Sequence, residues 1–383
     1  MNGFFSYLAT VEFVPQWVYL IPFVLILIRK AKRIKDYTIG FVKGKELISV
    51  NAIIIGLIIV FSVVNAIVNT PDRLHTVSAF PYHVLLLPTV VIAYFLNKND
   101  LKILIGWIFF ESIIAVIENV LGISTVFFWS PKFEVYNNPD LLYFSRPFGF
   151  SSNSSILAFK VLLGILLIHH QQLKGTYYKI VEGLFILVVI FTFGRTVILA
   201  LLFFYAFKQL YFFQKSRKKK IEEWFFLFGL GTLMLLGILV LAVAFQDTII
   251  GQFTRDTGSI ELSGRDKIWA FYKSFISESP FLGNGSLKLM FGKYHAHNSF
   301  LQLISSNGWV ISSLFIFLII KNLRLTNVLY IATILMYSLA QYGVFWGISL
   351  VDILFYYFLL NGVKDLKFTN PFVNFNNKNI NKA

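Results

Sequence analysis

The residue types best suited to chemistry gather in one polar stretch, residues 264–309, which has Arg265 near its start and His297 near the point where an apolar run resumes. Histidine is the side chain whose unperturbed pKa lets it act as a base near neutral pH. His297 is therefore the candidate for proton transfer, with His295 as its rival. The two histidines could instead bind a metal ion, although no nearby carboxylate or third histidine completes a set of ligands.

An amphipathic helix is predicted to carry Arg265 in its first turn. Ser263 followed by Asp266 resembles a capping box, apolar residues recur at spacings of three and four, and Pro280 ends the pattern. Such a helix is expected to lie on a membrane surface. The free backbone N–H groups of the first turn, together with a guanidinium, would hold an anion. The alternative is an arginine that anchors the helix to lipid headgroups.

Two other arginines lie beside apolar runs. Arg195 stands between two such runs with almost no loop. It is either an interfacial turn residue or, if buried, a cation that needs an anionic partner. Arg146 begins the segment RPFGFSSN, in which Pro147 and Gly149 predict a rigid turn and Asn153 could cap the following helix. A purely structural role is the alternative for this segment.

Two ionisable residues, Lys160 and Glu111, fall inside predicted membrane spans, where charged side chains are costly and usually paired. They could pair with each other. A proton or ion pathway is the alternative, and it would favour a transporter. The remaining histidines are interpreted as interfacial or structural residues: His75, His83, His169 and His170.

The elements that position these residues are predicted to be membrane helices. The 383 residues are 57% hydrophobic, 18% aromatic and only 14% charged, too little polar surface to cover a soluble protein of this size. The backbone of a chain that crosses hydrocarbon must be helical to satisfy its own hydrogen bonds. Because cysteine is absent, disulfides, thiolate metal sites and a cysteine nucleophile are excluded.

We therefore predict an all-α fold, a single transmembrane bundle over residues 1–362, with 246–297 as an extracytoplasmic active-site loop. The polar tail 363–383 is expected to be cytoplasmic and disordered. About eleven spans are predicted, at 9–28, 47–68, 80–96, 101–121, 154–170, 180–193, 197–213, 224–245, 298–320, 326–341 and 343–361.

The distribution of basic residues orients these spans. Residues 29–45 hold seven Lys or Arg and residues 215–220 hold five. With eleven spans both segments fall on one side, which the positive-inside rule makes cytoplasmic. The N-terminus is then expected outside and the C-terminus inside, with the loops 122–153 and 246–297 together on the outer face. The net charge of +15 is accounted for in this way, and nucleic acid is not an expected partner.

The order of these features resembles the O-antigen ligase and Wzy-type polysaccharide polymerase family. The resemblance covers residues 140–320: an Arg, Gly, Asn pattern at 146–153, Arg195 within Gly-Arg-Thr, Arg265 within Ser-Gly-Arg, and the pair His297-Asn298 before an apolar helix with an early Asn-Gly. It implies a C-type glycosyltransferase-like fold in a bacterial inner membrane, with the active loop on the extracytoplasmic face. It also selects His297 as the base and places Asn298 in the substrate site.

The same resemblance implies that donor and acceptor are oligosaccharides linked to undecaprenyl diphosphate, joined with inversion and without a metal or other cofactor. Arg195 and Arg265 would bind the diphosphate, and His297 would activate the acceptor hydroxyl. Arg146 and Asn153 would shape the donor site. These residue types suit the reaction, because guanidinium groups neutralise a diphosphate leaving group and one base must take the acceptor proton.

The function expected is polymerisation of a polysaccharide of O-antigen or capsule type. Short outer loops offer little surface for a large acceptor, which favours a polymerase over a ligase that transfers the glycan to lipid A core or protein. A flippase for lipid-linked sugars is the alternative from another class. It predicts charges spread through the spans, whereas the ionisable residues here concentrate in two outer loops. Membrane lipid and a chain-length-regulating protein are partners compatible with the resemblance.

Overall fold

The computed structural model describes residues 2–29, 50–69, 71–72, 74–123, 125–127, 146–215, 265–292 and 294–361. The chain divides into two compact units, of which the first comprises Met1–Leu201 and Arg265–Val363 and the second Leu202–Gly264 and Lys364–Ala383. The described helices belong to the first unit, except for the later part of the helix Arg195–Lys215, which belongs to the second. The predicted span 224–245, Ser263 with its capping box, most of both basic segments and the tail 363–383 lie outside the described residues.

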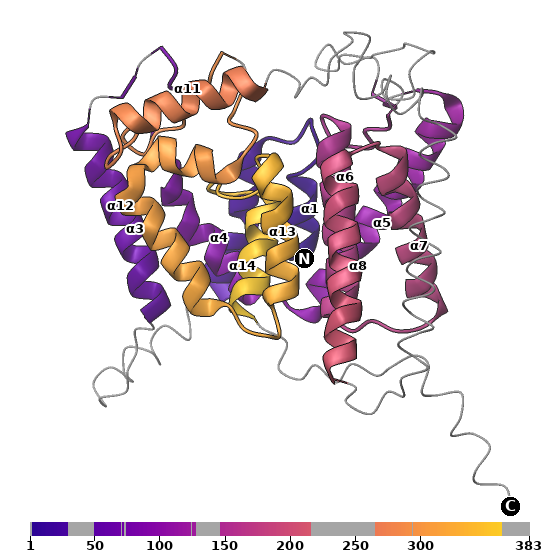
Figure 1. The fold of residues 1–383 in the computed structure, drawn as a ribbon. Helices are drawn as coiled ribbons and strands as arrows, with labels where there is room; N and C mark the ends of the chain where they lie inside the picture. The colour runs from indigo at the N-terminus through magenta and orange to yellow at the C-terminus, as the bar shows by residue number, and fades with distance from the viewer. Residues whose placement is uncertain are drawn as a thin grey trace, which may run out of the picture. The chain divides into compact units, whose positions relative to one another are not determined.

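The described residues form helices (Figure 1), and the strand-like pairing among them is limited to two isolated bridges, Thr76 with Leu289 and Phe291 with Tyr294. The η1 helix leads into an apolar helix, Trp17–Arg29. In chain order the elements are α1 (Asn2–Leu8), η1 (Gln16–Tyr19), α3 (Val50–Val68), η2 (Tyr82–Leu85), α4 (Leu86–Phe95), α5 (Lys98–Leu121), α6 (Ser154–His170), α7 (Thr176–Phe191), α8 (Arg195–Lys215), α11 (Arg265–Glu278), α12 (Ser299–Asn322), α13 (Val328–Ala340) and α14 (Leu350–Leu360).

Several helices expose apolar side chains and bury polar ones, the reverse of a soluble protein. Along α3 the exposed positions are apolar, whereas Ser62 and Asn65 are buried. In α5 the buried residues include Glu111 and Glu118. This arrangement suits hydrocarbon, where polar groups must find partners inside the bundle. Three of the described helices are long and apolar enough to cross a membrane, Val50–Val68, Lys98–Leu121 and Ser299–Asn322. The all-helical prediction is confirmed for the described residues.

The first predicted span, 9–28, is shorter in the structure, where its apolar helix begins at Trp17. Asn2–Leu8 forms the separate helix α1, and Pro15, with φ −67° and ψ 142°, precedes the helix that continues to Arg29. Proline has no N–H for a helical bond and favours a break of this kind. The α1 helix packs on α5, where the Gly3 N–H donates to Asp100 Oδ1 at 3.3 Å. The N-terminus and the start of α5 were expected on opposite sides, but they lie side by side.

The last predicted span, 343–361, is shorter than expected because α14 begins at Leu350. The preceding residues form a turn instead of a helix. The backbone N–H groups of Phe345 and Trp346 donate to the Asp352 carboxylate at 2.6 and 3.0 Å. Ser349 caps the helix by accepting from the Asp352 N–H. By contrast, the span predicted at 154–170 coincides with α6, Ser154–His170.

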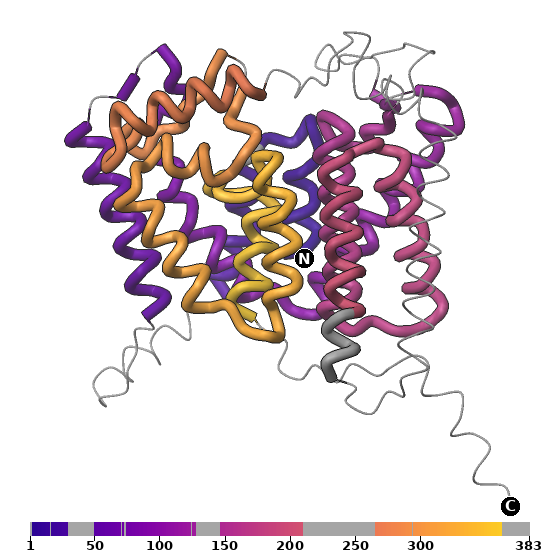
Figure 2. The backbone as a smooth tube through the Cα atoms, viewed as in Figure 1, coloured from indigo at the N-terminus to yellow at the C-terminus, as the bar shows by residue number. Residues whose placement is uncertain are grey.

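Helix α12 is broken at Gly308, where φ is 69° and ψ 178° (Figure 2). The carbonyls of Ser305 and Ser306 accept from the Asn284 N–H at 2.9 and 3.1 Å, and the Trp309 N–H donates to Pro280 O at 2.8 Å. The backbone groups freed by the break are therefore satisfied by the loop 280–286, as buried backbone requires. The Asn-Gly step noted in the sequence marks this break.

Candidate functional site

The C-terminal end of α13 holds three of the predicted site residues together. Arg265 Nη1 donates to Ala340 O at 2.9 Å, and Asn298 Nδ2 donates to Leu339 O at 2.8 Å. His297 Nδ1 lies 3.4 Å from Gln341 Oε1. The cationic, basic and amide side chains predicted from separate parts of the sequence thus meet at one helix end. Carbonyl groups at a helix C-terminus carry partial negative charge, which favours a guanidinium there.

The backbone at His297 orients the ring, and the contact of Nδ1 with Gln341 leaves Nε2 as the nitrogen directed elsewhere. The φ of His297 is 47°, in the left-handed region that few residues other than glycine adopt. Its N–H donates to His295 Nδ1 at 3.3 Å, and Asn298 then caps α12 by accepting from the backbone N–H groups of Phe300 and Leu301. With a proton on Nδ1 directed to Gln341, Nε2 of His297 carries the lone pair that a base needs.

Burial keeps both histidines neutral near pH 7. It lowers the pKa of His297, and the neighbouring charge of Arg265 adds to that effect, while the contact with Gln341 opposes it. Burial also lowers the pKa of His295 to about 3, with further contributions from His297, Lys288 and Arg265. A neutral imidazole can accept a proton, whereas an imidazolium cannot. The difference between the two residues is that His295 Nδ1 already accepts the His297 N–H.

The predicted amphipathic helix is present as α11, and its apolar face packs against protein. Ile268 and Tyr272 form a buried cluster with Leu289 and Ala296. Tyr272 Oη donates to Leu289 O at 3.0 Å, and Trp269 Nε1 donates to Ala296 O at 2.7 Å. Figure 1 shows α11 lying across the end of the first unit at which α12 begins. The face expected to rest on a membrane surface instead fixes the loop that carries the histidines.

Arg195 is exposed at the first position of α8, and the described contacts do not join it to Arg265 or His297. The N-terminal half of α6 lies between them. Gly194 approaches the Ala158 side chain, whereas the ring of Phe159, the next residue of α6, stacks on Tyr337 of α13. Arg195 is therefore near the same end of the first unit, on another side of α6.

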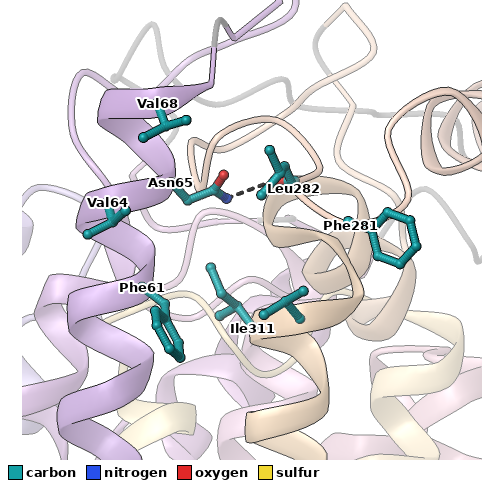
Figure 3. A pocket seen from close by; sticks show the side chains of 8 residues that line it. Phe61, Val64, Asn65, Val68, Phe281, Leu282 and Ile311 are labelled. Atoms are coloured by element: carbon teal, nitrogen blue, oxygen red, sulfur yellow. Dashed lines mark hydrogen bonds between the residues drawn. The ribbon is translucent and has the colours of Figure 1, made fainter.

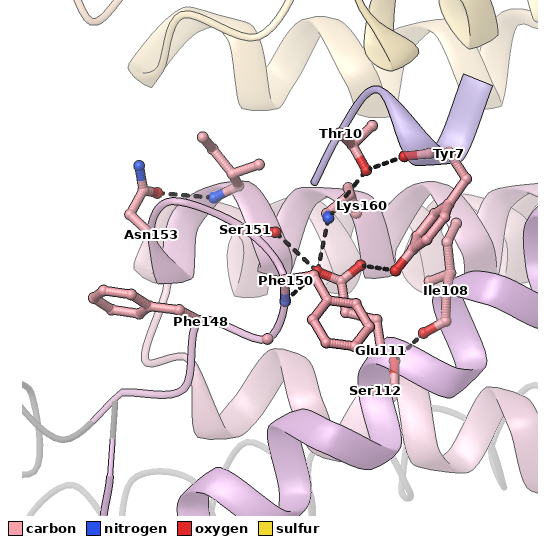
Figure 4. Close-up of polar contacts among 12 residues, drawn as sticks. Tyr7, Thr10, Ile108, Glu111, Ser112, Phe148, Phe150, Ser151, Asn153 and Lys160 are labelled. Atoms are coloured by element: carbon pink, nitrogen blue, oxygen red, sulfur yellow. Dashed lines mark hydrogen bonds and ion pairs between the residues drawn. The ribbon is translucent and has the colours of Figure 1, made fainter. Parts of the chain in front are cut away.

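The turn at residues 146–151 is held by two buried carboxylates of α5, and Figure 4 shows the one from Glu111. Glu118 accepts from the N–H groups of Phe148 and Gly149 at 3.0 and 2.7 Å. Glu111 accepts from the Phe150 N–H, the Ser151 hydroxyl and Tyr7 Oη, each at 3.0 Å. The sequence did not single out Glu118. Its place near the end of a predicted span, in reach of a Gly-containing turn, is the signal that was available.

The predicted pairing of Lys160 with Glu111 is confirmed, with Nζ 2.7 Å from Oε1 and both side chains buried. Lys160 Nζ also donates to Thr10 Oγ1 at 3.2 Å, so that this pair joins the N-terminal turn, α5 and α6. Asn153 is exposed and caps α6 by accepting from the Ile156 N–H at 3.0 Å, which is the structural role that the sequence allowed. Arg146 is half-buried at the start of the same turn.

Lys288 is a further cation that sequence reasoning missed. Its Nζ lies 3.9 Å from the centroid of the Trp346 ring and 5.1 Å from that of Tyr342. His295 packs on the same two rings, with centroid distances of 5.8 and 5.2 Å. Burial lowers the pKa of Lys288 to about 8, and the charge of Asp352 opposes that shift. A lysine in the predicted active-site loop was visible in the sequence, but its neighbours were not.

A separate apolar groove of about 140 Å³ lies between α3 and the second part of α12 (Figure 3). Its one polar lining residue, Asn65, already donates to Leu282 O at 2.8 Å and to Ser286 Oγ at 3.0 Å. The groove therefore offers contact to apolar groups and adds no polar residue to the cluster around His297. Its remaining lining residues are Phe61, Val64, Val68, Phe281, Leu282, Val310 and Ile311.

Among the described residues no group of three or more His, Cys, Asp or Glu could hold a metal ion. The donor atoms near His297 are instead cationic or amide groups, which suit an anionic or sugar ligand. No family model, curated protein or solved structure matches this chain.

Proposed function

We propose that this chain is a membrane glycosyltransferase of the polysaccharide polymerase type. It would transfer a glycan from an undecaprenyl-diphosphate carrier to a sugar hydroxyl of an acceptor repeat unit. The observation that carries the proposal is the meeting of Arg265 and His297 at the end of α13. The reaction needs one group that stays cationic and one that accepts a proton, and these two side chains provide them.

In the proposed reaction, the acceptor oxygen forms a bond to the anomeric carbon as the bond from that carbon to the diphosphate oxygen breaks. The diphosphate leaves with the electron pair, and the configuration at the anomeric carbon is inverted. His297 Nε2 takes the proton of the acceptor hydroxyl. The Arg265 guanidinium stabilises the charge that develops on the leaving diphosphate.

The other predicted residues have supporting parts in this proposal. Arg195 would bind the carrier diphosphate from the other side of α6, and Arg146 with Asn153 would shape the donor site. Asn298 would act chiefly by position, because its side chain caps α12 and contacts Leu339 O. The same cluster would serve a ligase, so the acceptor distinguishes the two: the short outer loops favour an incoming repeat unit over lipid A core or protein.

The test is purified protein in lipid vesicles, supplied with lipid-diphosphate-linked repeat units and no nucleotide sugar. Longer glycans and released carrier diphosphate are expected. Arg265→Lys keeps the charge but loses the bidentate guanidinium contact, so the rate of glycan extension should fall at least about tenfold. Arg324→Lys is the matched control, because Arg324 is exposed in the turn between α12 and α13, at the opposite end of α13.

Four results would count against the proposal. If the wild-type protein does not extend the repeat units, polymerase activity is excluded. If it transfers the glycan only to lipid A core or protein, the enzyme is a ligase. Full activity of Arg265→Lys would remove the diphosphate role of that side chain. Movement of intact lipid-linked units across the vesicle membrane, without new glycosidic bonds, would identify a flippase.

A further inference from the structure

The loop that carries Lys288 is held rigidly on both sides of that residue. The Lys288 N–H donates to Ser78 Oγ at 2.7 Å, and its carbonyl accepts from the Val77 N–H at 3.0 Å. The Met290 N–H donates to His75 O at 2.8 Å. These hydrogen bonds fix the backbone at Lys288 and therefore the direction in which its side chain leaves the chain.

That side chain is directed onto two aromatic rings beside the histidines. Tyr342 and Trp346 stack with centroids 4.2 Å apart, and Lys288 and His295 both pack on this pair. The His295 ring in turn lies 4.5 Å from that of His297. The aromatic pair thus brings the Lys288 ammonium to the same side-chain cluster as His295 and His297. Lys288, His295, His297 and Arg265 are half-buried, so they are partly desolvated and still reachable.

Two positive charges act on this cluster. The positive charges of Lys288 and Arg265 both act on His295. The carboxylate whose charge reaches Lys288 is Asp352, and it already accepts from Ser349 Oγ and from the N–H groups of Phe345 and Trp346. Like charges held together in a partly desolvated site favour the binding of an anion.

We propose that Lys288 is a second cationic ligand of the diphosphate bound by Arg265, with the two side chains holding the anion beside His295 and His297. The identity of the anion rests on the proposed function. Lys288 thereby adds to Arg265 and Arg195, the two arginines to which the family resemblance assigns the diphosphate. A planar guanidinium and a compact ammonium are complementary phosphate ligands, since one binds two oxygens at once and the other adapts to the remaining charge.

The variant Lys288→Met tests this role, because methionine keeps an unbranched apolar stem against Trp346 and Tyr342 and removes the charge. Binding of undecaprenyl diphosphate, undecaprenol and inorganic pyrophosphate is measured on the full-length protein in detergent. We expect Lys288→Met to weaken the binding of undecaprenyl diphosphate roughly 10- to 100-fold and the binding of undecaprenol less than about twofold. Lys267→Met is the matched control, because Lys267 is exposed on α11.

The pyrophosphate arm shows whether the site takes the diphosphate alone or only with its lipid. Weakened pyrophosphate binding in Lys288→Met supports the proposal in either case. Three results overturn it: unchanged binding of undecaprenyl diphosphate, an equal loss for undecaprenol, or an equal loss in Lys267→Met. If wild-type protein extends glycans while Lys288→Met binds undecaprenyl diphosphate normally, only the role of Lys288 as a diphosphate ligand fails. If wild-type protein extends none while Lys288→Met loses the diphosphate, the anion site stands and the proposed reaction fails.

Discussion

The substitution Gly308→Ala tests whether the break in α12 positions the proposed site. Gly308 has φ 69°, and a Cβ there would overlap the Phe281 carbonyl and lie 2.5 Å from the Leu282 nitrogen. A methyl group therefore cannot be placed while the left-handed turn and the approach of residues 281–282 are both kept. We expect the loop 280–286 to separate from α12 in this variant.

The magnitude follows from the contacts that would be lost. An alanine in the left-handed region costs about 1 kcal/mol more than glycine. Three backbone N–H donors join the loop to the break: Trp309 N–H to Pro280 O at 2.8 Å, Asn284 N–H to Ser305 O at 2.9 Å and to Ser306 O at 3.1 Å, and Ser286 N–H to Ser306 O at 2.8 Å. Each stabilises the fold by about 1 kcal/mol net. The free energy of unfolding should fall by about 2–4 kcal/mol, because some of these groups find other partners.

The assay is thermal unfolding in detergent, followed by the fluorescence of the seven tryptophans. Gly308→Ala should unfold at least about 5 °C below wild type and should bind undecaprenyl diphosphate more weakly, because residues 280–286 lead directly to Lys288. Gly106→Ala is the control: it lies in α5 with nothing within 4 Å of its Cβ, so stability should hold or rise by up to about 1 kcal/mol. An unfolding temperature of Gly308→Ala equal to that of wild type would refute the reasoning.

Three further outcomes are expected. His297→Ala should slow glycan extension about 10²–10⁴-fold and His295→Ala much less, and chelators should not change the wild-type rate. An equal loss of rate in the two variants, together with inhibition by chelators, would indicate a metal site. Burial and the Arg265 charge hold the pKa of His297 below 6.5, so kcat/KM should persist as pH falls through 6.5. Arg265→Gln removes that charge and raises the pKa of His297, so the fall of kcat/KM at acid pH should begin at higher pH. An unchanged pH profile would exclude an effect of Arg265 on the His297 pKa. Lys160→Met leaves the Glu111 carboxylate buried without its cation and should cost about 3–5 kcal/mol of unfolding free energy, less when combined with Glu111→Gln; additive losses would show that the two do not interact.

The sequence by itself determined the features that depend on local chemistry. In hydrocarbon the backbone must bond within its own helix, so an apolar run predicts a helix without knowledge of its neighbours, as Ser154–His170 illustrates. Charges inside such runs are usually paired, which is why a pair of Glu111 with Lys160 was one interpretation of the sequence, and this pair is present. Arg265 and His297 were selected as candidates from residue type and motif, and their meeting at α13 is the part that the structure adds.

Only the tertiary structure decided the features that depend on distant partners. The apolar periodicity of α11 does not say whether lipid or protein covers it, and the covering residues, Leu289 and Ala296, follow in a loop without regular pattern. Lys288 joins the cluster because residues 76–78 hold its backbone and Trp346 receives its side chain, and neither partner is near it in sequence. Local pattern specifies a helix because its bonds close within one turn. A site assembled from loops is specified by contacts between residues far apart in the chain, which only the folded structure brings together.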